Sequence, residues 1–197
     1  MLILFKFVKN SIMKKYWIQY RSFLLFLGKF TITYLVLTFI YESYLDQFDD
    51  KTFELDGITK LVAKQTEDLL LFFNADVSSE LHVSQPGVKL FYNQKYVARI
   101  IEGCNALSVI VLFISFVVAF AGKLKYTIPY IIGGSLFVYL LNIVRIAILT
   151  IAIYHFPNQQ SFLHGVVFPL FIYGVVFGLW VVWVDKFSFY AKKPSKS

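Results

Sequence analysis

Three side chains in the second half of the chain could together carry out acyl transfer. Cys104 is the only cysteine, and it stands where a polar segment meets an apolar run. The thiolate is the nucleophilic form of cysteine, and a helix amino terminus or a neighbouring cation favours it over the thiol. His164 could activate the thiol or protonate a leaving amine, and Arg145 could donate fixed hydrogen bonds to an oxyanion. These residue types predict nucleophilic cysteine chemistry, for which we expect no metal and no other cofactor.

Each of these residues also has a purely structural interpretation. A lone cysteine in a membrane protein is most often a small apolar filler, and a histidine at the start of an apolar helix can be an interfacial cap. An arginine in such a helix can extend to the lipid headgroups or pair with a buried carboxylate. A carboxylate partner for Arg145 is disfavoured, because no Asp or Glu occurs from Ala106 to Val184. His155 competes with His164 for the role of the base, since both precede the last apolar run.

Three further polar residues lie near this set in the sequence and could orient it. Glu102 and Asn105 flank Cys104. Asn142 precedes Arg145 by three residues, so the two side chains share one face of a helix. We predict a supporting role for these three residues.

The elements that carry these residues are apolar enough to cross a bilayer. The sequence is 58% hydrophobic and 16% charged, and about 20 apolar residues span the hydrocarbon layer as a helix. We predict an all-α membrane protein, a bundle of four transmembrane helices over residues 23–41, 105–122, 126–153 and 164–184. The flanking segments are a cytoplasmic interfacial amphipathic stretch, an extracytoplasmic segment and a basic cytoplasmic tail, over residues 1–22, 42–104 and 185–197.

The charges are segregated along the chain, which predicts its orientation in the inner (cytoplasmic) membrane. Eleven Lys and Arg but only one acid, Asp185, lie before the first span, between the second and third, and after the fourth. The segment from Glu42 to Gly103 holds the other eleven acids and six bases. By the positive-inside rule both termini are cytoplasmic. The basic excess then indicates orientation and not nucleic-acid binding, and Cys104, Arg145 and His164 all fall at the extracytoplasmic ends of their helices.

The extracytoplasmic segment is expected to form a lid over these ends. Apolar residues at helical spacing after Asp56-Gly57 predict an amphipathic helix. Two short aromatic and β-branched runs, residues 88–92 and 95–101, flank Asn93-Gln94 and predict a β-hairpin. Such a hairpin could bind an extended peptide by strand addition.

The chain resembles the exosortase/archaeosortase family, and within it the short type called exosortase F. The resemblance rests on Glu-Gly-Cys-Asn-Ala-Leu-Ser around Cys104, Asn-Ile-Val-Arg ending at Arg145, and Leu-His-Gly around His164, in the family's order and topology. It favours His164 over His155 as the base. Many family members have Ser-Gly after the cysteine, where this chain has Asn105-Ala106.

The resemblance implies a cysteine transpeptidase. Its substrates would be exported proteins with a C-terminal sorting signal, made of a short motif, a transmembrane helix and a basic tail. The enzyme would cut this signal through a thioester and transfer the protein to an acceptor such as a lipid or a glycan. Two alternatives stay open: a non-enzymatic membrane assembly or anchoring subunit, and a small transporter in which Arg145 is an anion site.

Overall fold

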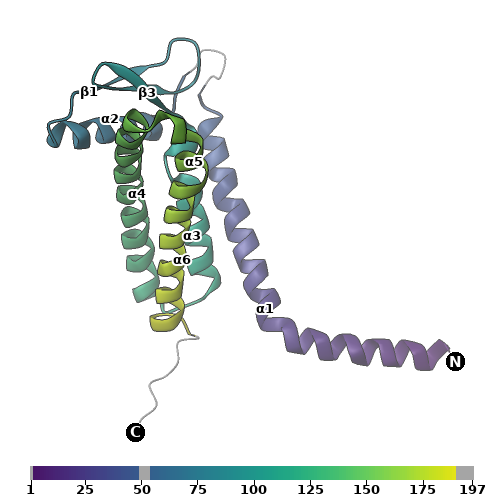
Figure 1. Ribbon diagram of the computed structural model, residues 1–197. Coiled ribbons are helices and arrows are strands. Elements are labelled where there is room, and N and C mark those ends of the chain that lie inside the picture. Colours follow the sequence, from purple (N-terminus) through teal and green to yellow (C-terminus); the bar gives the residue numbers. More distant parts are fainter. Residues whose placement is uncertain (1, 49–53, 190–197) are drawn as a thin grey trace, which may run out of the picture.

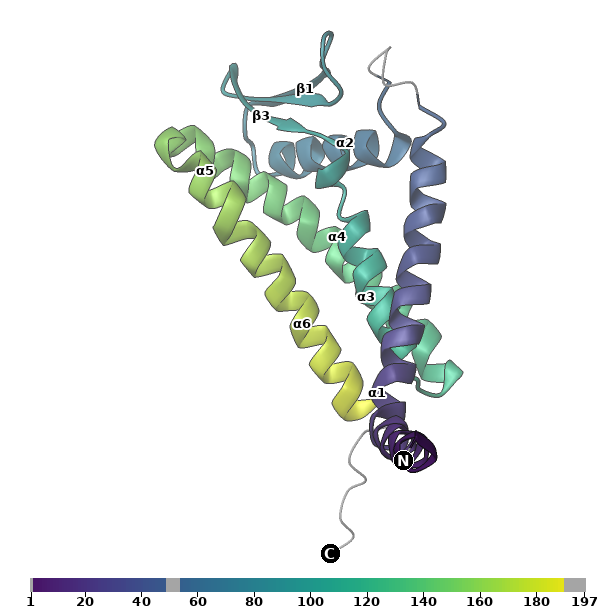
Figure 2. The same ribbon diagram turned by 90° about the vertical axis from the view of Figure 1, so that its right-hand side faces the viewer.

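The computed structural model describes residues 2–48 and 54–189, which form a helical bundle capped at one end by a small sheet. The elements along the chain are α1 (Leu2–Leu45), α2 (Gly57–Phe72), β1 (Val77–Leu81), β2 (Val88–Tyr92), β3 (Lys95–Ile100), α3 (Leu107–Ala119), α4 (Leu124–His155), α5 (Gln160–Phe162) and α6 (Phe168–Lys186). The helices α3, α4 and α6 pack together, and α1 lies beside α3. Figure 1 and Figure 2 show α2 and the sheet lying across one end of this bundle.

Three helical segments among the described residues are long and apolar enough to cross a membrane: Tyr20–Leu45, Leu124–His155 and Pro157–Lys186. The predicted count of four spans is therefore not confirmed. The helix α3 has thirteen residues, which corresponds to a length of about 20 Å, against a hydrocarbon layer of about 30 Å. The apolar run that predicted a longer helix includes residues at both ends that are not helical. Ala106 lies before the first turn, with a φ of 63°, and Phe120 ends the last one.

The first helix is longer than the predicted span. The helix α1 begins at Leu2 and runs without interruption to Leu45, so the predicted amphipathic stretch and the predicted span form one helix. Figure 1 shows the amino-terminal part of α1 turning away from the bundle. At the other end of the chain α6 stops at Lys186, and residues 190–197 of the predicted basic tail lie outside the described residues.

The helix α2 confirms the predicted amphipathic helix, including its start. Asp56 is the N-cap, and its carboxylate accepts hydrogen bonds from the backbone amides of Ile58 and Thr59, both at 2.9 Å. This arrangement satisfies two of the amides that a helix start leaves without partners. The face around Val62 and Leu70 is buried, and it fixes α2 across the end of the bundle.

The sheet contains the predicted hairpin and one strand that was not predicted. Strands β2 and β3 pair antiparallel, with Tyr92 opposite Lys95. Asn93 and Gln94 between them have φ values of 48° and 60°, as a two-residue hairpin turn of type I′ requires. Strand β1 pairs with the other edge of β2, so the order is β1-β2-β3. Its sequence, Val-Ser-Ser-Glu-Leu, lacks the alternation of apolar and polar residues that would have indicated a strand.

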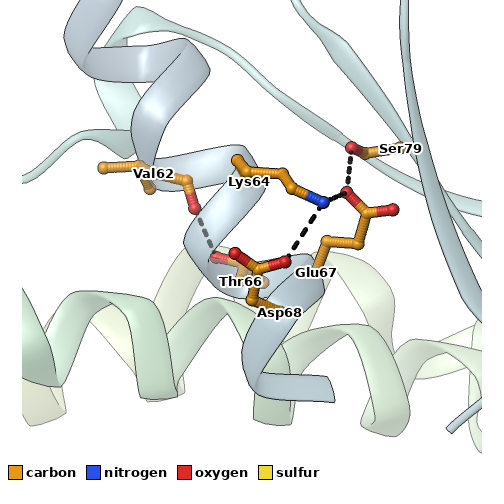
Figure 3. A network of polar contacts seen from close by, with 6 residues as sticks. All are labelled: Val62, Lys64, Thr66, Glu67, Asp68 and Ser79. Atoms are coloured by element: carbon orange, nitrogen blue, oxygen red, sulfur yellow. Dashed lines mark hydrogen bonds and ion pairs between the residues drawn. The ribbon is translucent and has the colours of Figure 1, made fainter. Parts of the chain in front are cut away.

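The helix α2 and the three-stranded sheet, together called the lid below, share a hydrophobic core with the bundle. One hydrophobic cluster joins α2 and the sheet to α4, and its buried members include Leu55, Val62, Leu70, Val88, Leu90, Ile100, Ile146 and Ala147. Figure 3 shows the polar contacts on α2 beside β1. There Glu67 accepts a hydrogen bond from the Ser79 hydroxyl at 2.8 Å and lies 3.3 Å from the Lys64 ammonium. The lid therefore holds a fixed position over the ends of the helices.

Candidate active site

Cys104 lies at the junction between the lid and the bundle. It ends a 3-10 turn, Glu102–Cys104, that links β3 to α3. The Cys104 amide donates to the carbonyl of Ile101 at 2.8 Å, and the Asn105 amide donates to the carbonyl of Glu102 at 3.2 Å. The thiol is half-buried, close to the amino-terminal end of α3. The tight turn fixes its position.

Arg145 and Asn142 extend from α4 towards this turn. The Asn142 side-chain amide donates to the Cys104 carbonyl at 2.6 Å, and its oxygen accepts from Nη1 of Arg145 at 3.2 Å. Asn142 is completely buried. Asn142 thus forms hydrogen bonds both to Arg145 and to the turn that carries Cys104. At least one N–H group of the Arg145 guanidinium, at Nε, is buried and has no hydrogen-bond partner among the described residues.

His164 approaches the same place from the other side. It belongs to a five-residue π-helical turn, Leu163–Val167, that precedes α6, and such turns are frequent at functional sites. A cavity of about 80 Å³ is lined by Cys104, Arg145 and His164 together. The structure therefore brings the three sequence-predicted residues, from three different segments, around one cavity.

A wider groove shares part of its lining with this cavity. It has a volume of about 570 Å³, and its lining includes Cys104, His164 and most of β3. Ala98, Arg99 and Gln160 border both the groove and the inner cavity. No sequence signal indicated Arg99 or Gln160, since neither belongs to a motif and only the fold brings them to the site.

The other two predicted supporting residues, Asn105 and Glu102, lie outside both cavities. Asn105 is buried, and its amide nitrogen lies 2.8 Å from the Tyr41 hydroxyl and 3.3 Å from that of Thr59. Its oxygen accepts from the Leu107 amide at 3.0 Å. Asn105 therefore joins α1, α2 and α3 and lines neither cavity. Glu102 is half-buried in the turn and does not border the cavities either.

His155 lies at the carboxyl end of α4 and is exposed. Its ring contacts that of Tyr154 edge-to-face, with 5.1 Å between the centroids. It borders neither the groove nor the inner cavity. Of the two histidines that compete for the role of the base, only His164 shares a cavity with Cys104.

The residue after Asn105 gives a testable consequence of the turn geometry. Ala106 has a φ of 63° and is buried, and the left-handed conformation costs a non-glycine residue about 1–2 kcal/mol. Glycine would relieve this strain but would remove a buried methyl group worth about 0.8 kcal/mol. We expect Ala106→Gly to keep the thermal stability close to wild type. Ala106→Val should lower it clearly, because β-branched residues are genuine outliers at positive φ.

Thermal unfolding in detergent, followed by the loss of the monodisperse peak, measures both Ala106 variants. Equal stability of the valine and glycine variants would show that the left-handed turn is not required.

The fold and the cavity define a multi-pass helical membrane protein in which Cys104, Arg145 and His164 line one cavity beside the small sheet. The model of the transmembrane exosortase family (Exosortase_EpsH) matches residues 18–184. Since this match covers well over half of the 197 residues, the chain belongs to the transmembrane exosortase family. Searches of curated proteins and of solved structures gave no significant match.

Proposed function

We propose that the protein is a membrane-embedded cysteine transpeptidase that removes a C-terminal sorting signal from exported proteins. The observation that carries this proposal is the cavity shared by Cys104, Arg145 and His164 in a chain that belongs to the transmembrane exosortases. The groove from the lid to Cys104 offers a path for a peptide. The substrates would carry a short motif, a transmembrane helix and a basic tail, as family membership implies.

The proposed reaction has two halves. The Cys104 thiolate attacks a substrate carbonyl carbon, and the negative charge moves to the carbonyl oxygen, where Arg145 donates hydrogen bonds. The C–N bond then breaks, and protonated His164 gives its proton to the leaving amine. The sorting helix leaves with a new amino terminus, and the substrate remains as a thioester on Cys104.

In the second half, an acceptor amine, hydroxyl or water attacks the thioester carbon. His164 takes the proton of this nucleophile, and the C–S bond breaks to restore the thiolate. The cycle consumes no redox equivalent and leaves the enzyme unchanged. Asn142 is a positioning residue in this scheme, because it contacts the Cys104 carbonyl and the Arg145 guanidinium.

The proposed orientation places this site on the extracytoplasmic side, with both termini in the cytoplasm. A membrane-impermeant maleimide added to intact cells should label Cys104 slowly, because the thiol is half-buried. In a Cys104→Ala background, Ser78→Cys on the exposed face of the lid should label quickly. Lys125→Cys, at the far end of α4, should label only after permeabilisation. If Lys125→Cys were labelled in intact cells and Ser78→Cys were not, the protein would have the opposite orientation in the membrane.

The two histidines supply a direct test of the proposed function. His164→Ala should slow processing of a sorting-signal reporter by about 10²–10⁴, the usual contribution of general acid–base catalysis. His155→Ala is the matched control and should process at the wild-type rate, because this side chain lies outside the cavities. Processing time courses at equal protein level compare the two variants. Loss of activity with His155→Ala alone would assign the base to the other histidine.

A further inference from the structure

Strand β3 has one paired and one unpaired side. The strand order β1-β2-β3 makes β3 an edge strand, and within the described part of the chain no further strand pairs with it. An edge strand presents a row of backbone N–H and C=O groups that another extended chain can use. Natural proteins often guard such edges with charges and bulges. Strand β3 carries Lys95 and Arg99, and its pairing with β2 is irregular between Leu90 and Phe91.

Strand β3 borders the groove. Four consecutive residues, Tyr96 to Arg99, line it, and Ile101 lies beside it as well. In a regular strand successive side chains point to opposite faces of the sheet, but Val97 has no partner on β2 at the irregularity between Leu90 and Phe91. The groove therefore follows β3 along its length, with lining residues on both sides of this bulge.

The groove also includes part of the candidate active site. Gln160 and His164, from the segment before α6, line it together with Cys104 and with Gln85 of the loop between β1 and β2. The turn that carries Cys104 begins two residues after β3 ends. A volume of about 570 Å³ lies within the range of about 300–1,000 Å³ that is usual for ligand sites.

We propose that the substrate segment next to the scissile bond binds in extended form along the free edge of β3, as a fourth strand of the sheet. This inference rests on the proposed function, and it assigns the lid a role in binding the substrate polypeptide. Main-chain hydrogen bonds to β3 hold the peptide, and alternate side chains point towards and away from the bundle. The strand leads directly into the turn of Cys104, so a paired peptide delivers its carbonyl to the thiol.

Disulfide scanning tests this geometry, because Cys104→Ala leaves the chain without any cysteine. In that background, Tyr96→Cys or Arg99→Cys places one thiol on the edge of β3, where both side chains are exposed. The probe is a secreted reporter that ends in a sorting signal which the wild-type protein has been shown to shorten. It carries single cysteines at successive positions before its transmembrane helix. Copper phenanthroline is the oxidant, and the full-length protein stays in its membrane.

Strand addition predicts cross-linking that rises and falls severalfold with a period of two residues along the reporter. The favoured positions should shift when the thiol moves from residue 96 to residue 99. Ser78→Cys is the matched control, since Ser78 is exposed on β1, the other edge strand, and borders neither cavity. It should cross-link only at background level.

Uniform cross-linking, a helical period, or equal cross-linking from Ser78→Cys would overturn the binding mode while leaving the proposed function intact. If the wild-type protein shortens no sorting-signal reporter, the proposed function fails first and this inference fails with it.

Discussion

Cys104→Ala is expected to abolish processing of a sorting-signal substrate while the protein still accumulates and inserts normally. Removal of the nucleophile from a protease costs on the order of 10⁶ in rate, which exceeds what a cellular assay can detect. The fold should tolerate the change. Asn142 bonds to the backbone carbonyl of residue 104 and not to its side chain, and the thiol packs only at the margin of the lid core.

Two further variants, Cys104→Ser and Ser108→Ala, test the same prediction. Cys104→Ser should be nearly as inactive, because an alkoxide forms much less readily than a thiolate near neutral pH. Ser108→Ala, one turn away on an exposed position of α3, should process normally. The yield of shortened reporter at matched protein level compares the three variants. Full processing by Cys104→Ala would exclude the thiol as nucleophile and would favour the assembly-subunit alternative.

Arg145→Lys is expected to lower the processing rate by about 10²–10³, the usual loss when one oxyanion donor is removed. Lysine keeps the positive charge but loses the planar fork of the guanidinium. In the structure one end of this fork donates to Asn142, while the buried Nε has no partner within the described residues. A lysine carries all its donors on one nitrogen, so an ammonium placed at Asn142 leaves the position of Nε without a donor.

Arg21→Lys is the matched control for Arg145→Lys. Arg21 is exposed on α1 and borders neither of the two cavities. We expect nearly wild-type processing, because the same chemical substitution is then made away from the site. Single-turnover rates of both variants test whether Arg145 acts as an oxyanion donor. Wild-type rates for Arg145→Lys would leave Arg145 with a structural role only.

Sequence patterns predicted the elements that depend on local signals. The N-cap at Asp56, the turn at Asn93-Gln94 and the long apolar segments of α4 and α6 each form as local physical chemistry dictates. The grouping of Cys104, Arg145 and His164 at one end of the bundle followed from charge segregation and helix length. The structure places all three around one cavity.

Features that depend on tertiary context were not predictable. Strand β1 is polar and is held by pairing with β2 and by the contact between Ser79 and Glu67. The end points of α3 depend on the left-handed Ala106 and on packing against α6, where Trp183 donates to the carbonyl of Phe120. Asn142 was predicted as a neighbour of Arg145, but its bond to the cysteine turn required the packing of α4 against the lid.

The mass of the reporter's C terminus, isolated from cells with the wild-type protein or with Cys104→Ala, tests the central claim most directly. With the wild-type protein we expect a reporter that ends before its transmembrane helix, with the added mass of an acceptor or of water. With Cys104→Ala we expect only the full-length reporter. The same shortened C terminus in both strains would contradict a cysteine transpeptidase centred on Cys104.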